Sequence, residues 1–292
     1  MPELPEVETV RRRLATCLPG LTLRSLQVDD ATVSEQSEAE LRRLLKGHRV
    51  RCLRRRGKYL IIDFGGATGE ALGEARGEAL GGAHAEALLI VHLRMTGQLV
   101  FKAEDSARRP RFTIAFDPAT DLFFYDTRRF GRVWALTPDQ EDQFFAKLGV
   151  EPLSADFTPA LLRSLAQGRR APLKSFLIDQ RHIAGIGNIY ADEALFRARL
   201  HPLREAGSLG PREAQRLHAA IQQVLQLGIE HEGSSIESFI DPAGRRGSFQ
   251  EILNVYGRTG QPCRVCETPI ERIVVGGRGT HSCPHCQPRK MR

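Results

Sequence analysis

Four cysteines near the C-terminal end carry the strongest chemical signal in the sequence. They form two Cys-x2-Cys pairs, Cys263 with Cys266 and Cys283 with Cys286, and 16 residues separate the pairs. Two such pairs supply four thiolates in the tetrahedral arrangement that zinc prefers, and the intervening residues leave room for a β-hairpin. Because protein ligands fill all four positions, we predict one structural zinc ion rather than a catalytic metal.

The segment between the cysteine pairs fits that hairpin. Gly276-Gly277 separates two short runs, and Arg278 lies just past the predicted turn. Residues 241–292 are short of apolar side chains, so this region needs a metal to fold. Two other cysteines, Cys17 and Cys52, are isolated, and we expect both to be small buried apolar side chains.

A second signal lies at the beginning of the chain, which reads Met-Pro-Glu. Removal of the methionine, usual before a small residue, exposes the secondary amine of Pro2, and a terminal amine is partly unprotonated at neutral pH. Such an amine can attack a sugar C1′ and form an iminium ion, which is an electron sink for phosphate elimination. Glu3 and Glu6 are candidate acid or base groups beside it.

Two more segments suit an anionic partner. The turn Gly185-Ile-Gly187 leads into a predicted helix capped by Asn188, whose N–H groups and dipole favour a phosphate. The run 42–58 contains Lys and Arg but no acidic residue, and we expect Lys58, between Gly57 and an apolar run, to be its most restrained member. On spacing alone, an ordinary capped helix joint and a solvated charged face stay open as interpretations.

The elements that must position these residues change in type along the chain. One helix is predicted over 5–18, followed by eight short β segments with no helix between them, which favours an antiparallel sandwich. Helical periodicity then predominates. We therefore expect an α+β protein with an N-terminal β-sandwich and one helix, a helical domain, and a terminal zinc-finger hairpin. The expected parts are a sandwich domain at 1–135 with a glycine-rich loop insertion at 69–88, a linker at 136–152, a helical domain at 153–240, and a loop with the zinc finger at 241–292.

Composition narrows the class of partner. Among 292 residues, Lys and Arg total 42 against 35 Asp and Glu, a net charge of +7 that favours a polyanion. No apolar run approaches the roughly 20 residues that cross a bilayer, and the acidic N-terminus is unlike a signal peptide. We expect a cytosolic protein.

Taken together, these motifs resemble formamidopyrimidine-DNA glycosylase, the bacterial repair enzyme for oxidised purines. The resemblance covers the chain apart from the glycine-rich repeat. It rests on PELPEVETVRR, RGKYL, HLRMTGQL, DTRRFG, LGVEPLS, GIGNIYADEALF, VYGRTGQPCRVC and CPHC. It implies a monomeric, nucleoid-associated glycosylase and AP lyase that excises 8-oxoguanine and formamidopyrimidines from damaged duplex DNA and cleaves the strand by β,δ-elimination.

The resemblance also implies roles for individual residues. Pro2 matches the nucleophile that forms the Schiff base, Glu3 the catalytic acid, and Lys58 the lysine near the lesion phosphate. Asn188 and Arg278 match residues that hold phosphates around the everted nucleotide, the first from a helix–two-turns–helix joint.

Other positions carry weaker implications. Met95, Arg128 and Phe130 match the side chains that fill the space left by the flipped base, where an apolar wedge replaces stacking. Arg109 stands where relatives often have a phosphate-contacting histidine. The segment 240–248 resembles a mobile loop over the extruded base.

Three alternative functions account for part of this pattern. An endonuclease VIII-like glycosylase shares the Pro2 chemistry but prefers oxidised pyrimidines, and the PELPE start disfavours it. A non-catalytic zinc-ribbon DNA-binding protein explains the charge and the thiolates but not the Pro2-Glu3 terminus. A zinc hydrolase or deaminase is disfavoured because the predicted metal site is closed.

Overall fold

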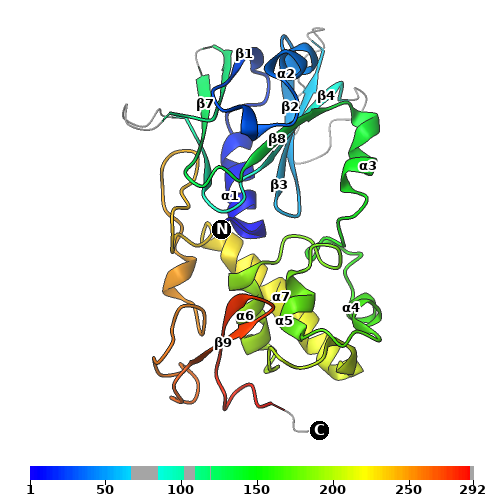
Figure 1. The fold of residues 1–292 in the computed structure, drawn as a ribbon, viewed down its shortest axis with the longest axis vertical. Helices are drawn as coiled ribbons and strands as arrows, with labels where there is room; N and C mark the ends of the chain where they lie inside the picture. The colour runs from blue at the N-terminus through cyan, green and yellow to red at the C-terminus, as the bar shows by residue number, and fades with distance from the viewer. Residues whose placement is uncertain (67–84, 102–108, 119, 290–292) are drawn as a thin grey trace. The chain divides into compact units, whose positions relative to one another are not determined.

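A computed structural model of the protein describes residues 1–66, 85–101, 109–118 and 120–289 (Figure 1). The chain forms two compact units. The first contains residues 1–2, 6–146 and 235–247, and the second contains residues 3–5, 147–234 and the chain from 248 onward. Most of the predicted insertion at 69–88 lies outside the described residues, and its last residues, from Ala87, begin a strand.

Eight antiparallel strands build the first unit, in the order β5-β7-β6-β1-β2-β3-β4-β8. The strands are β1 (Thr22–Val28), β2 (Arg49–Arg56), β3 (Tyr59–Gly65), β4 (Ala87–His92), β5 (Gly97–Val100), β6 (Phe112–Asp117), β7 (Thr120–Asp126) and β8 (Arg132–Leu136). Strands β1 and β2 share a single register pair, Thr22 with Arg49, so the sheet divides there into two halves. Side chains from both halves enter one core, which confirms the predicted antiparallel sandwich.

Helices complete the first unit. Helix α1 (Leu4–Ala15) places Val7, Val10 and Leu14 in the core of the sandwich, as its apolar stripe predicts. Helix α2 (Glu38–Leu45), between β1 and β2, was not expected, although its local signal is clear. Ser37 Oγ accepts from the Glu40 N–H, and the Glu40 carboxylate accepts from the Ser37 N–H at 2.7 Å, a capping box. A short α3 (Glu141–Phe145) ends this part of the chain.

The prediction that Cys17 and Cys52 are buried is wrong, because both are exposed. In β2 the register shifts between Val50 and Cys52. This bulge puts Val50 and Leu53 on the core side and leaves Cys52 facing outward, so simple alternation fails. Cys17 follows the last turn of α1, beyond the helical stripe.

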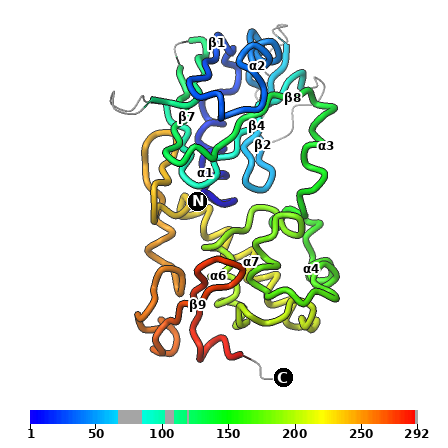
Figure 2. The backbone as a smooth tube through the Cα atoms, in the orientation of Figure 1, coloured from blue at the N-terminus to red at the C-terminus, as the bar shows by residue number. Residues whose placement is uncertain are grey.

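The second unit contains four α-helices in its described part, shown in Figure 1 and traced as a tube in Figure 2. They are α4 (Pro159–Ala166), α5 (Leu173–Ile178), α6 (Asn188–Arg197) and α7 (Pro211–Glu230). Helix α6 is buried along nearly its whole length. It packs closely on α7, since a Cβ at Gly228 would lie 2.4 Å from the Tyr190 ring. Asn188 is the first helical residue and Gly187 is the N-cap, one position earlier than predicted.

The end of the chain forms the predicted hairpin. Strands β9 (Glu271–Val275) and β10 (Arg278–Ser282) pair antiparallel across Gly276 and Gly277. Both turn glycines have positive φ angles, 57° and 75°, a backbone conformation that is unfavourable for residues with a side chain. No helix in the described part of the chain has the length and apolar character needed to cross a membrane.

Candidate functional site

Glu3 lies at the N-terminal end of helix α6, within the second unit. Its buried carboxylate accepts the Gly187 N–H at 2.6 Å and the Ile189 N–H at 3.0 Å. A Cβ at Gly187 would lie 2.3 Å from the Glu3 carboxyl carbon, so this position requires glycine. Two of the N–H groups that the sequence suggested for a phosphate therefore bind an internal carboxylate instead, which helix dipoles favour equally.

Helix α6 is also joined to the C-terminal hairpin, and this contact brings Asn188 and Arg278 into one place. The Asn188 side chain donates to the Gly279 carbonyl at 3.0 Å, next to the exposed Arg278. Asp192 accepts the His281 N–H at 2.9 Å. A side-chain amide and a guanidinium held together in this way can bind adjacent oxygens of a phosphate backbone.

Lys174 and Asp192 form a buried ion pair behind Asn188 that the sequence analysis did not identify. Their side chains are fully buried and form an ion pair, and the Lys174 ammonium also donates to the Asn188 carbonyl at 2.9 Å. Burial lowers the pKa of Lys174, while the negative charge of Asp192 opposes that shift. The available signal was a charged residue among apolar neighbours, Lys174 beside Leu173 and Asp192 beside Ala191, because such groups are buried only when paired.

Another carboxylate of α6 holds the segment that enters the cysteine region. Glu193 is buried and accepts the backbone N–H groups of Asn254, Val255 and Tyr256 at 2.9–3.0 Å. Three donors on one carboxylate fix the path of this segment. The hairpin and the segment before the cysteines are thus held by Asp192 and Glu193, neighbouring residues of α6.

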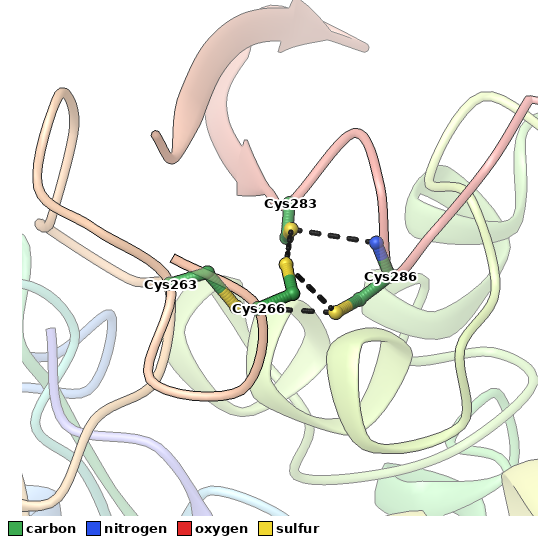
Figure 3. A group of neighbouring side chains, drawn as sticks. All are labelled: Cys263, Cys266, Cys283 and Cys286. Atoms are coloured by element: carbon green, nitrogen blue, oxygen red, sulfur yellow. Dashed lines mark hydrogen bonds between the residues drawn. The ribbon is translucent and has the colours of Figure 1, made fainter. Parts of the chain in front are cut away.

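The four predicted cysteines converge, with their sulfur atoms pointing toward one another (Figure 3). All four Sγ atoms lie within 4.8 Å of one another, and Cys266 Sγ is 3.4 Å from those of Cys283 and Cys286. Zn–S bonds of about 2.3 Å at tetrahedral angles require S···S separations near 3.8 Å. The thiolate set therefore fits one structural zinc ion, and every ligand position is provided by the chain.

In the first unit, Lys58 occupies the turn between β2 and β3. Gly57 has φ of 56°, and its carbonyl accepts from the Arg55 guanidinium at 3.0 Å, which fixes the turn. The Lys58 side chain is only 5% exposed. Pro2 is buried in the same unit, and Arg109 is exposed shortly before β6.

Met95, Arg128 and Phe130 come from two neighbouring loops of the first unit, β4–β5 and β7–β8. The Arg128 guanidinium lies 5.1 Å from the centre of the Phe130 ring, and Phe130 is 50% exposed although it is large and apolar. The Arg128 N–H donates to the Thr96 hydroxyl at 3.1 Å, which places the β7–β8 loop beside the residue that follows Met95. The structure thus brings the three predicted wedge positions onto adjacent loops.

Three family profiles match the chain in succession. The formamidopyrimidine-DNA glycosylase N-terminal domain matches residues 1–133, the H2TH domain of the same family matches 148–240, and a zinc finger found in FPG and IleRS matches 260–289. The chain belongs to the formamidopyrimidine-DNA glycosylase family. The last profile contains all four cysteines, which agrees with the predicted zinc centre.

Individual members of the family are similar to this chain over nearly its full length. Formamidopyrimidine-DNA glycosylase of Chloroflexus aurantiacus is 43% identical over 98% of both chains, and that of Pelotomaculum thermopropionicum is 42% identical over 99% of this chain and all of the relative. The crystal structure of the Thermus thermophilus family member has a TM-score of 0.84 at 40% identity, covering 99% of this chain and all of that chain. A Lactococcus lactis family member bound to Fapy-dG-containing DNA has a TM-score of 0.86 at 34% identity, with the same coverage. The family predicted from the motifs is therefore confirmed.

Proposed function

We propose that this protein is a bifunctional DNA glycosylase and AP lyase that removes 8-oxoguanine and formamidopyrimidines from duplex DNA during base excision repair. Family membership supports this, since relatives of known structure are bound to Fapy-dG-containing and abasic DNA. The observation that carries the proposal is the N-terminal Pro2-Glu3 pair, in which two backbone N–H groups orient the buried Glu3 carboxylate.

In the proposed first reaction, Pro2 acts after Met1 has been removed. Its nitrogen lone pair attacks the deoxyribose C1′, and the bond from C1′ to the damaged base breaks. Glu3 supplies a proton to the sugar ring oxygen or the departing base. Loss of the proton from the Pro2 nitrogen and opening of the sugar ring leave an iminium ion, the Schiff base.

Strand cleavage follows from the iminium ion. A proton leaves C2′, the electrons move toward the iminium, and the C3′–O bond breaks to release one phosphate. In a second elimination a proton leaves C4′ and the C5′–O bond breaks to release the other phosphate, and water then hydrolyses the C1′–N bond and frees the Pro2 amine. Lys58, restrained in the β2–β3 turn, is suited to stabilise or protonate a departing phosphate oxygen.

The remaining site residues hold the DNA in this proposal. Asn188 and Arg278, joined through Gly279, bind phosphates beside the everted nucleotide, and Arg109 binds another. The wedge is formed by Met95, Arg128 and Phe130. Phe130 and Met95 replace the lost stacking, while Arg128 offers hydrogen-bond donors to the unpaired cytosine.

We further propose a division of labour along the chain. Residues 1–135 carry the catalytic groups, 136–152 link them to a DNA-binding helical part at 153–240, and 241–292 contribute the lesion loop and zinc finger. The protein acts as a monomer in the cytoplasm, associated with the nucleoid, where its duplex substrate lies.

Borohydride trapping on a duplex containing 8-oxoguanine opposite cytosine tests the proposal. Reduction of the Schiff base should give a covalent protein–DNA complex with the mature chain. Pro2→Gly should reduce trapping by at least about a thousandfold, and Glu3→Gln should suppress base release by a similar factor, within the range that active-site residues contribute. One residue added before Pro2 should abolish trapping, and efficient trapping by that extended protein would contradict the role of Pro2.

A substrate comparison separates the endonuclease VIII-like alternative. The proposal expects faster excision of 8-oxoguanine than of thymine glycol in matched duplexes. The opposite order would assign the protein to oxidised pyrimidines while leaving the Pro2 chemistry intact.

A further inference from the structure

One buried carboxylate joins the two loops that carry the wedge positions. Asp126, the last residue of β7, has a side chain with no exposed surface. It accepts the Gly131 N–H at 2.6 Å and the Arg128 N–H at 3.3 Å, both in the β7–β8 loop. It also accepts the hydroxyl of Thr96, which belongs to the β4–β5 loop beside Met95.

Asp126 is itself held by a second layer of charge. Arg111, buried directly before β6, donates to Asp126 at 3.2 Å and to the Gly131 carbonyl at 3.0 Å. The same guanidinium donates to Asp30 at 2.7 Å, and Asp30 also accepts from Arg129 at 2.9 Å. The ladder of Asp30, Arg111 and Asp126 therefore reaches three residues of the β7–β8 loop.

The backbone of both loops needs such support. Arg94, just before Met95, has φ of 55°, and Arg129, between Arg128 and Phe130, has φ of 60°. These left-handed conformations are unfavourable for residues with a Cβ and persist only where surrounding contacts impose them. The hydrogen bonds to Asp126 and Asp30 supply those contacts for the β7–β8 loop.

We propose that Asp126 is a positioning residue that presets the Met95, Arg128 and Phe130 side chains for insertion into the DNA base stack. This inference rests on the proposed function of the wedge. Because its side chain is fully buried, Asp126 makes no direct contact with DNA in this proposal. It acts by holding the two loops in register before DNA arrives, so that a half-exposed ring and a guanidinium enter the stack without first being ordered.

The test uses Asp126→Asn in the full-length, zinc-loaded protein. Asparagine keeps the shape but removes the charge that faces Arg111 and replaces one acceptor oxygen with a donor. The first measurement is the fluorescence change of 2-aminopurine placed opposite a stable abasic analogue, which reports wedge insertion without any chemistry. The wild-type protein should change this fluorescence, and the variant should lose at least half of the amplitude at saturating protein.

The second measurement is the single-turnover rate of 8-oxoguanine excision. A misplacement of about 1 Å can cost on the order of a hundredfold in rate, so Asp126→Asn should slow excision opposite cytosine by about 10- to 100-fold. Excision opposite an abasic position, where extrusion is less costly, should slow by less than about threefold. Thr96→Val removes only the hydroxyl bridge and should change both measurements in the same direction by a smaller factor.

Asp63→Asn is the matched control. Asp63 is a buried carboxylate of the same unit that binds the Arg54 guanidinium at 2.6 Å and 2.7 Å on β2. It should leave the fluorescence change and the excision ratio unaltered. Equal slowing of Asp126→Asn on both substrates, or an unchanged fluorescence amplitude, would overturn the positioning role. Absence of excision by the wild-type protein would instead overturn the proposed function, since the fluorescence arm requires no catalysis.

Discussion

The two units hold their candidate site residues by different means. In the first unit, Arg128 and Phe130 are exposed on the β7–β8 loop. The buried Asp126 carboxylate fixes the backbone of this loop by accepting its N–H groups. In the second unit, Asn188 begins a buried helix, and Arg278 begins a strand of the hairpin that connects the two cysteine pairs.

The difference is greatest between the core of the sandwich and the cluster around the cysteines that carries Arg278. The sandwich has a large apolar core that stabilises the fold, so single buried carboxylates can order its loops without the fold depending on them. The cysteine region has a small cluster, consisting mainly of Phe196, Val255, Ile270 and the cysteines themselves. A region of that size depends on metal for its structure, so metal loss should affect the second unit far more than charge loss affects the first.

The largest effect expected from this comparison is on the cysteine cluster. Cys283→Ser removes one thiolate from a site whose zinc affinity contributes on the order of 10 kcal/mol to folding the finger. DNA affinity should fall by at least about a hundredfold, because Arg278 loses its position. Zinc content and duplex binding measure this directly.

Cys52→Ser supplies the control for that experiment, since Cys52 is an exposed cysteine of the first unit. It should retain zinc and DNA affinity. Full DNA affinity in zinc-free Cys283→Ser protein would show that the finger does not depend on the metal for its position.

An intermediate effect is expected at the phosphate contacts. Arg278→Ala should reduce the slope of log affinity against log salt by about 1, the value for one phosphate contact. Because the Asn188 side chain donates to the Gly279 carbonyl, Asn188→Ala should weaken the contact made by Arg278 as well. The double variant should therefore lose less affinity than the sum of the single losses.

Arg181→Ala is a suitable control for the charge alone. Arg181 is exposed in the second unit, but Asp179 balances its charge at 2.7 Å. For Arg181→Ala, the slope of log DNA affinity against log salt should stay within a few tenths of the wild-type value. Strictly additive losses for Asn188 and Arg278 would indicate that the two residues act separately.

The smallest effect concerns the β4–β5 loop and pH. Burial, with the positive charges of Arg94 and Lys58, lowers the pKa of His92 to about 3 from 6.5. Between pH 6.5 and 3, His92 is protonated in the unfolded chain but not in the folded protein. The free energy of unfolding therefore falls as the pH drops through this range. The contribution of this group is about 1.4 kcal/mol per pH unit in that range.

Denaturant unfolding at pH 8, 6 and 5 checks that sign. His92→Gln removes the titrating ring, so its free energy of unfolding should decline less between pH 8 and pH 5 than that of the wild-type protein. The two proteins should differ by a constant amount above pH 7.5. Parallel curves down to pH 5 would show that His92 is protonated in the folded state.

Much of the site could be predicted from local patterns. The spacing of Cys263, Cys266, Cys283 and Cys286 and the Gly276-Gly277 turn specify a thiolate centre and its hairpin through neighbouring residues alone. Helix α2 was missed although Ser37 and Glu40 signal it locally, whereas the bulge that exposes Cys52 has no comparable signal in the sequence.

The hydrogen-bond partners of the buried carboxylates could not be predicted from such local patterns. The Asp126 carboxylate accepts a hydrogen bond from Thr96, 30 positions earlier in the chain, and the Glu3 carboxylate accepts one from Gly187, 184 positions later. Spacing, composition and turn chemistry act over a few residues, so the sequence by itself determined the cysteine centre and the hairpin, and it predicted the role of the N-terminal Pro2-Glu3 pair. Only the tertiary structure decided which backbone N–H groups each carboxylate holds, because those donors come together through packing of elements that are distant in the chain.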